Sequence, residues 1–171
     1  MVGGVGTASL PVGVTRVTAS APGYASATFP VAAEAGRPSR LNVTLKAAKV
    51  AVKQDRIEIY DKIYFDTNRA TIKPASFPLL DEIAAVLTAR PDILLVRVEG
   101  HTDSRGDNAT NQTLSDLRAA SVRDALVQRG ISPDRLRSVG YGETQPLDDR
   151  PTAAAWDKNR RVAFAIERWA P

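Results

Sequence analysis

Residues 93–122 read ILLVRVEGHTDSRGDNATNQTLSDLRAASV, and they carry the main signals for the fold. The run at 93–99 is mostly Ile, Leu and Val, which is typical of a strand. A polar loop follows, and helical periodicity then extends over about 112–129 and stops at Gly130. The stretch therefore predicts a strand, a loop and a helix in series, the unit from which α/β domains are built.

The alternation of strands and helices continues on both sides of this stretch. The further expected elements are a helix at 76–90 and strands at 57–65, 135–139 and 160–168. Ser76 is the expected N-cap of the first helix, and Pro91 follows its end. Apolar and polar residues alternate strictly in the last strand, so one face of the sheet is expected to be wetter. These patterns predict an α/β (α+β) two-layer sandwich of β-α-β-α-β-β order, with a mixed four-stranded sheet and the helices on one face.

Residues 1–46 have a different composition, rich in Val, Thr and Ala and interrupted by turn signals. Short strands are expected there at 12–19, 25–33 and 40–46. The segment resembles the second half of a PEGA-like or carboxypeptidase-regulatory-like β-sandwich, so we expect a partial sandwich whose first half is missing. The alternative is a β-rich linker without a core of its own.

Residues 47–56 (AAKVAVKQDR) are polar and basic, and we expect them to be a linker to a domain at 57–171. The net charge of +4 comes from the N-terminal part of the chain. Residues 1–56 have seven basic and two acidic side chains, whereas residues 58–171 have sixteen and seventeen. A nearly neutral domain without closely spaced aromatic residues on its strands matches RNA-binding sandwiches poorly, and we expect no nucleic-acid partner.

The chain has no cysteine and a single histidine, His101, so any metal site would be short of ligands. We expect no metal and no other cofactor. No stretch reaches about 18 consecutive apolar residues, and the N-terminus lacks the basic start and apolar segment of an export signal. Any attachment to a membrane is therefore expected to come from a missing upstream anchor.

Arg118 is the most informative local conflict in the sequence. In the second expected helix it lies four residues after Leu114 and four before Val122, in the middle of the apolar stripe. A guanidinium keeps its proton in practice, so at the edge of a core it needs an acceptor such as a carboxylate. Asp103, just past the carboxyl end of a strand, is the expected supplier. The residues alone support two interpretations equally: an internal salt bridge, or a pair that grips a ligand carrying both an ammonium and a carboxylate.

Four motifs make a family resemblance specific. GHTDSRGDNATNQTLSDLRAASV, at 100–122, resembles the signature of the OmpA-like C-terminal domain family, including its Leu-Ser-x-x-Arg-Ala helix start. IYFDTNRATIKP, VGYGETQP and KNRRVAF are similar to the family's Phe-Asp strand end, Gly-x-Gly-Glu loop and closing Asn-Arg-Arg-Val strand. The match spans roughly residues 57–168, in the family's order and spacing.

The resemblance implies a non-enzymatic domain that holds the peptide stem of peptidoglycan through its meso-diaminopimelate residue. Such domains tie an outer-membrane or envelope protein to the cell wall, at the periplasmic face of the outer membrane of a Gram-negative bacterium. Asp103 and Arg118 would be the pair that grips the free amino and carboxylate end of the diamino acid. Further family positions that line the pocket correspond to Phe65, Asp66 and Leu114. The positions expected to support the pocket are Thr102, Asn111, Asn159, Arg160 and Arg161.

The sequence departs from the family pattern at Arg105 and Asp107, which add charges at the expected rim of the pocket. They are expected to influence the preference for amidated or non-amidated stems. Trp156, in a variable region, is expected either to cover the pocket or to pack in the core.

Two other functions compete with wall binding. A hydrolase would need His101 with Asp103 and either Ser104 or Ser115, but the sequence has no Gly-x-Ser-x-Gly elbow, and a lone histidine is more often structural. A domain that uses this fold for protein contacts alone would not need both Asp103 and Arg118.

Overall fold

The computed structural model describes residues 9–171 except residues 22, 25–26 and 39. The chain divides into two compact units, Met1–Ala48 and Lys49–Pro171, each of which is described by itself. Among the described residues, no helix is both long and apolar enough to cross a membrane.

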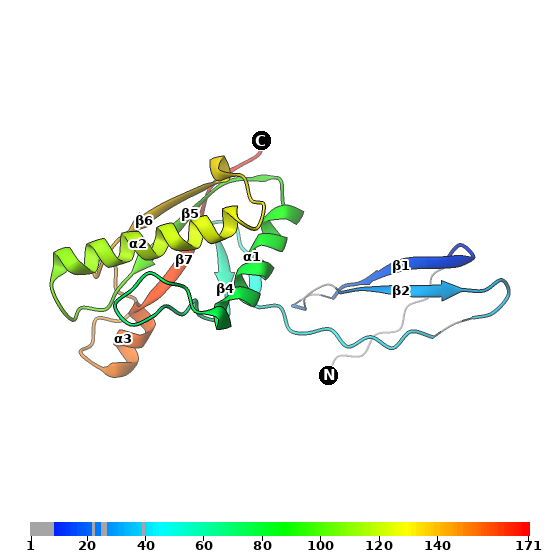
Figure 1. Ribbon diagram of the computed structural model, residues 1–171, viewed down its shortest axis with the longest axis horizontal. Helices are drawn as coiled ribbons and strands as arrows, with labels where there is room; N and C mark the ends of the chain where they lie inside the picture. Colours follow the sequence, from blue (N-terminus) through cyan, green and yellow to red (C-terminus); the bar gives the residue numbers. More distant parts are fainter. Residues whose placement is uncertain (1–8, 22, 25–26, 39) are drawn as a thin grey trace. The chain divides into compact units, whose positions relative to one another are not determined.

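The first unit contains one antiparallel hairpin (Figure 1). Strands β1 (Gly13–Ala19) and β2 (Ala27–Ala33) pair in continuous register. They agree with the strands expected at 12–19 and 25–33, except that residues 25–26 lie outside the described residues. None of the described residues up to Ala48 is buried, so the hairpin has no core of its own among them.

The strand expected at 40–46 is wrong. These residues join no ladder, and the nearest pairing is an isolated bridge between Tyr24 and Ala47. Sequence alternation describes an extended chain, but a strand also needs a neighbour to receive its backbone hydrogen bonds.

The second unit is a mixed five-stranded sheet in the order β3-β4-β7-β5-β6 (Figure 1). Its strands are β3 (Val50–Val52), β4 (Arg56–Ile59), β5 (Ile93–His101), β6 (Leu136–Gly140) and β7 (Arg161–Trp169). The β5–β6 pair is parallel and the other pairs are antiparallel. The carboxyl ends of β5 and β6 therefore meet the beginning of β7 at one end of the sheet.

Two helices, α1 (Phe77–Ala89) and α2 (Asn108–Val127), cover one face of this sheet, and a short α3 (Ala153–Asn159) precedes β7 (Figure 1). Two 3-10 turns, η1 (Pro74–Ser76) and η2 (Pro133–Arg135), lead into α1 and β6. The core lies between the helices and the sheet. Its fully buried side chains include Leu80, Ile83 and Leu87 of α1, Val122 and Leu126 of α2, Val96 and Val98 of β5, and Phe164 of β7. The predicted two-layer α/β class and mixed sheet are confirmed.

The predicted strand count of four is wrong, because Val50–Val52 in the expected linker 47–56 form β3 and pair with β4. Only three residues long and flanked by lysines, β3 leaves no periodic signal. The strand expected at 57–65 ends at Ile59. Further along, the chain bonds to the segment before α1, where Tyr64 N donates to the Ser76 hydroxyl at 2.8 Å.

Helix boundaries also differ from expectation. Ser76 stands at the N-cap position of α1, but its side chain makes no capping bond because it accepts from Tyr64 instead. The second helix, α2, begins at Asn108 rather than at about 112. Asp107 caps its N-terminus, because the Asp107 side chain accepts from Thr110 N at 2.9 Å. Helix α3 was not expected at all.

Candidate ligand-binding site

The first half of α2 packs closely against the carboxyl ends of β5 and β6. A Cβ added at Gly100 would lie 2.2 Å from the Ser115 carbonyl oxygen, and one at Gly140 would lie 2.3 Å from Asp116 N. Ser115 is fully buried, and its hydroxyl accepts from Gly142 N at 2.8 Å. Glycine at the two strand positions thus lets the helix approach the strand ends closely enough to form these bonds.

The buried face of α2 differs from the expected apolar stripe. Its buried residues are Asn111, Ser115, Ala119, Val122 and Leu126. Arg118 is half-buried, which agrees with its expected position at the edge of the core. Leu114 is also only half-buried, so its expected place in the apolar stripe is wrong. The reason is that two polar residues occupy core-facing positions where neighbouring loops supply their hydrogen bonds.

Asp103 lies just beyond the end of β5 and is 6% exposed. Its Oδ1 accepts from Arg105 N at 3.0 Å and from Arg105 Nε at 3.2 Å. Its Oδ2 accepts from Arg105 Nη2 at 2.9 Å and from Arg160 Nη1 at 2.7 Å. Burial acts to raise the pKa of Asp103, but the bonds from these two arginines outweigh it and lower the pKa to about 2. At neutral pH the carboxylate is therefore ionised, and the chain itself occupies both of its oxygens.

Arg118 is held beside this carboxylate without pairing with it. Its Nε donates to the Arg69 carbonyl at 3.1 Å, and its guanidinium carbon lies 5.0 Å from the centre of the Phe65 ring. Burial lowers the pKa of Arg118, repulsion by Arg160 lowers it further, and attraction to Asp103 opposes both effects. Within the described chain no carboxylate forms an ion pair with Arg118, so an internal Asp103–Arg118 salt bridge, the first of the two interpretations, is not formed.

Asp66 organises the turn that faces Arg118. Its backbone N donates to Thr71 O at 3.0 Å and its carbonyl accepts from Arg69 N at 3.1 Å. This turn presents the Arg69 carbonyl to the guanidinium. The Asp66 side chain makes no hydrogen bond with any described residue, so the structure does not join its carboxylate to the rest of the site.

Asn111 ties the loop after β5 to α2. Its Nδ2 lies 3.2 Å from the carbonyl oxygens of Asp103 and Arg105 and 2.6 Å from Glu143 Oε2. Thr102 fixes the same loop through its backbone, since its N donates to Gly142 O at 2.8 Å. These bonds hold the backbone on either side of the Asp103 carboxylate.

Asn159 and Arg161 bind loop backbone rather than the Asp103 carboxylate. Asn159 Oδ1 accepts from Leu147 N at 2.8 Å, and its Nδ2 donates to Asp148 O at 2.7 Å. Arg161 Nη2 donates to Gln145 O at 3.2 Å. Arg160, placed with them as a supporting residue by the sequence, instead contacts the Asp103 carboxylate directly.

His101 is not part of a catalytic constellation. Its ring is buried and stacks on Tyr141 with centroids 5.4 Å apart, and neither ring nitrogen has a hydrogen-bond partner among the described residues. Burial, aided by Arg161, lowers its pKa to about 4. The Ser115 hydroxyl donates to a helix carbonyl, so it is not activated by a base. The described residues also contain no group of three His, Cys, Asp or Glu side chains placed to hold a metal.

A hollow of about 450 Å³ lies on the helix-free face of the sheet, where Ala163 and Ala165 of β7 leave space beside Glu99 and Arg161. Its lining includes neither Asp103 nor Arg118, so the cavity and the charged site are separate features.

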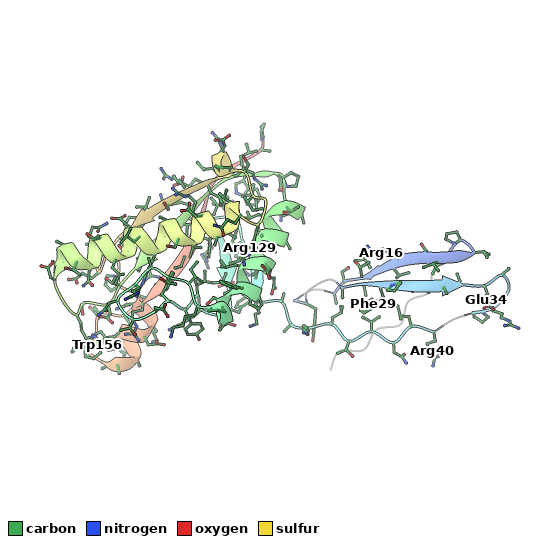
Figure 2. The ribbon with its side chains drawn as sticks, viewed as in Figure 1. Arg16, Phe29, Glu34, Arg40, Arg129 and Trp156 are labelled. Carbon is green, nitrogen blue, oxygen red and sulfur yellow. The ribbon has the colours of Figure 1, made fainter. Side chains whose placement is uncertain are left out.

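The sequence did not reveal how Arg105 and Trp156 act. Arg105 bonds to Asp103 and its guanidinium carbon lies 4.5 Å from the centre of the Trp156 ring, which α3 carries beside the site (Figure 2). The signal that could have indicated the pairing is the Asp-x-Arg spacing of Asp103 and Arg105. The same spacing at Asp148 and Arg150 produces the same local pair, with bonds of 2.8 and 2.6 Å.

The chain matches the family model described as "OmpA family" over residues 64–160. It is 35% identical to the peptidoglycan-associated lipoprotein of Rhizobium meliloti over 121 residues, covering 70% of this chain and 68% of the relative. It is 39% identical to outer membrane porin F of Pseudomonas fluorescens over 115 residues, covering 67% of this chain but only 34% of the porin. The chain thus spans about a third of the length of that relative.

Solved structures show the same architecture. The peptidoglycan-associated lipoprotein from Burkholderia pseudomallei is 28% identical with a TM-score of 0.56, covering 61% of this chain and 88% of that one. The cell wall anchor of the T6SS from Pseudomonas aeruginosa is 29% identical with a TM-score of 0.59, covering 70% and 88%. The periplasmic domain of Helicobacter pylori MotB, at 21% identity and a TM-score of 0.59 over 71% of this chain and 82% of that one, shares the fold.

Proposed function

Because the chain belongs to the OmpA family, a non-enzymatic family of peptidoglycan-binding domains, we propose that its second unit binds the peptide stem of peptidoglycan through the meso-diaminopimelate residue. The free end of that residue carries an ammonium and a carboxylate on one carbon. Recognition of such a group needs an acceptor and a bidentate donor close together, in a place that excludes bulk water.

The observation that carries the proposal is the state of Arg118. A half-buried guanidinium with no carboxylate partner among the described residues is costly to keep, and stacking on Phe65 with one bond to Arg69 leaves its terminal nitrogens for another acceptor. A ligand carboxylate is the natural acceptor, and its geometry matches that of a guanidinium.

Asp103 supplies the other half of the recognition. Its ionised carboxylate accepts the ligand's ammonium, while Arg118 donates to the ligand's carboxylate. Phe65 orients Arg118 by stacking, Leu114 flanks it one helical turn earlier, and Asp66 forms the turn below it. Thr102 and Asn111 hold the loop that carries Asp103, and Arg160 shares its carboxylate.

The relatives of this chain include outer-membrane porins and peptidoglycan-associated lipoproteins of Gram-negative bacteria. We infer that this chain works in the same compartment and ties an outer-membrane or envelope protein to the wall. For the first unit, we propose a partial PEGA-like sandwich, supported by the β1–β2 hairpin.

The test is calorimetric titration of the chain with free meso-diaminopimelate, lysine and glycine, together with sedimentation on purified sacculi. We expect Asp103→Ala and Arg118→Ala each to weaken binding by about 2–5 kcal/mol, because each substitution leaves a charge in the complex without its partner. Arg123→Ala is the matched control, because Arg123 lies on the same helix and pairs with its neighbour Asp124 instead. Variants at 103 and 118 that still sediment like the parent would disprove this site.

A further inference from the structure

Arg105 occupies the place that a ligand's ammonium needs. A carboxylate offers about four lone-pair positions, and in Asp103 three of them receive Arg105 N, Nε and Nη2 while the fourth receives Arg160. A ligand ammonium therefore cannot bind Asp103 until one of these donors leaves.

The two arginines on Asp103 differ in what else holds them. Arg160 is 39% exposed in its side chain and also donates to Asp157 at 3.0 Å, so a second carboxylate keeps it in place. Arg105 is 57% exposed, and beyond Asp103 its guanidinium contacts the Trp156 ring. Moving Arg105 breaks no ion pair except the one that the ligand replaces. Its side chain can leave while its backbone N keeps the loop closed on Oδ1.

We propose that Arg105 is an internal stand-in for the ligand's ammonium: its guanidinium occupies Asp103 in the unliganded chain and is displaced when the ligand's ammonium binds. The inference rests on the proposed function and adds a residue that sets its affinity and specificity. A ligand with a carboxylate alone cannot displace Arg105, because it offers Asp103 no replacement cation. Together with Arg160, the stand-in supplies counter-charge to the buried carboxylate while the site is empty, which offsets part of the cost of burying it.

Trp156 makes the displacement measurable. It is one of two tryptophans in the chain, so Trp169→Phe leaves it as the only source of indole fluorescence. The guanidinium that stacks on it moves when the ligand binds, so its emission should change along the binding curve. Removing Arg105 should remove this change without removing binding.

The experiment uses the full chain carrying Trp169→Phe, titrated with free meso-diaminopimelate by calorimetry and by fluorescence. We expect Arg105→Gln to bind about two- to fivefold more tightly, as loss of a partly exposed competing ion pair predicts, and to lose the fluorescence change. Arg150→Gln is the matched control, because it removes the same Asp-x-Arg contact from Asp148, outside the site. It should leave affinity and fluorescence response at the parent values.

The outcomes separate this inference from the function on which it rests. Binding that Asp103→Ala abolishes, but that Arg105→Gln leaves unchanged or weakens, would overturn the stand-in and keep the site. A fluorescence change that persists in Arg105→Gln would also overturn it. Absence of any calorimetric binding by the parent would overturn both the function and the inference.

Discussion

Replacing Arg118 by methionine is expected to abolish ligand binding while leaving the fold as stable as before or slightly more stable. Methionine keeps an unbranched side chain that can pack on the Phe65 ring, as sulfur does favourably, but it carries no charge. It therefore removes the proposed carboxylate donor and leaves most of the packing in place.

The size of the stability change follows from the contacts of Arg118. The substitution loses one hydrogen bond, from Nε to Arg69 O, at a cost of about 1 kcal/mol. It also removes a half-buried charge with no carboxylate partner among the described residues, together with the repulsion from Arg160. Relief of an uncompensated polar group amounts to about 1–3 kcal/mol when it is fully buried and less at half burial. The net effect on the free energy of unfolding should be between about 0 and +1 kcal/mol, or up to a few degrees in Tm.

The assay is urea unfolding followed by far-UV circular dichroism, combined with the meso-diaminopimelate titration. Arg129→Met is the matched control, since Arg129 also stacks on a phenylalanine, Phe77, but pairs with Asp81 at 2.7 Å. We expect the control to lose stability and to keep binding. A loss of about 2 kcal/mol or more in Arg118→Met would refute the reasoning, because it would make Arg118 a structural residue whose charge is satisfied in the empty site.

Two further predictions concern the scaffold around the site. The pKa of His101 is lowered to about 4, so between about pH 6.5 and pH 4 the unfolded chain binds a proton that the folded chain does not. The free energy of unfolding should therefore fall by up to about 3 kcal/mol as the pH drops through that window. In a pH series of urea melts, His101→Phe should lack this pH dependence. A variant that keeps the full pH dependence would show that other groups cause it. Gly100→Ala should lower the free energy of unfolding by about 3 kcal/mol or more, because its Cβ would lie 2.2 Å from the Ser115 carbonyl oxygen. A loss below about 1 kcal/mol in the same melts would show that α2 can move away from β5 at little cost.

Sequence patterns predicted the fold where an element is long and periodic. Helix α1 and strands β5 and β7 have such signals, because each buries one face of a continuous apolar pattern. Strand β3 is too short to show a period, and residues 40–46 show one without a partner strand. In both cases the outcome depends on which backbone lies alongside, and this is not encoded locally.

The sequence proposes the residues of the candidate site but not the pairing of their charges. Asp103 and Arg118 were identified from a charge that interrupts an apolar pattern and from the carboxyl end of a strand. Their spacing gave no indication that Arg105 and Arg160 would share the Asp103 carboxylate while Arg118 remained unpaired. That arrangement depends on loop geometry set by Asn111 and by the close packing of α2, both of which are tertiary effects.

The uneven distribution of partners between Asp103 and Arg118 argues for a ligand rather than a structural role. A structural ion pair lowers the free energy of the folded chain by satisfying both charges at once, so a fold shaped only for stability would join these two neighbouring groups. Here the acid is bound by Arg160 and by the more exposed Arg105, and the half-buried base pairs with no described carboxylate. A ligand with an ammonium and a carboxylate on one carbon removes both imbalances in a single step: its ammonium replaces Arg105, and its carboxylate gives Arg118 the counter-charge that it lacks. A ligand with only one of these charges corrects only one of them, so the site should prefer amino-acid head groups to simple amines or carboxylates.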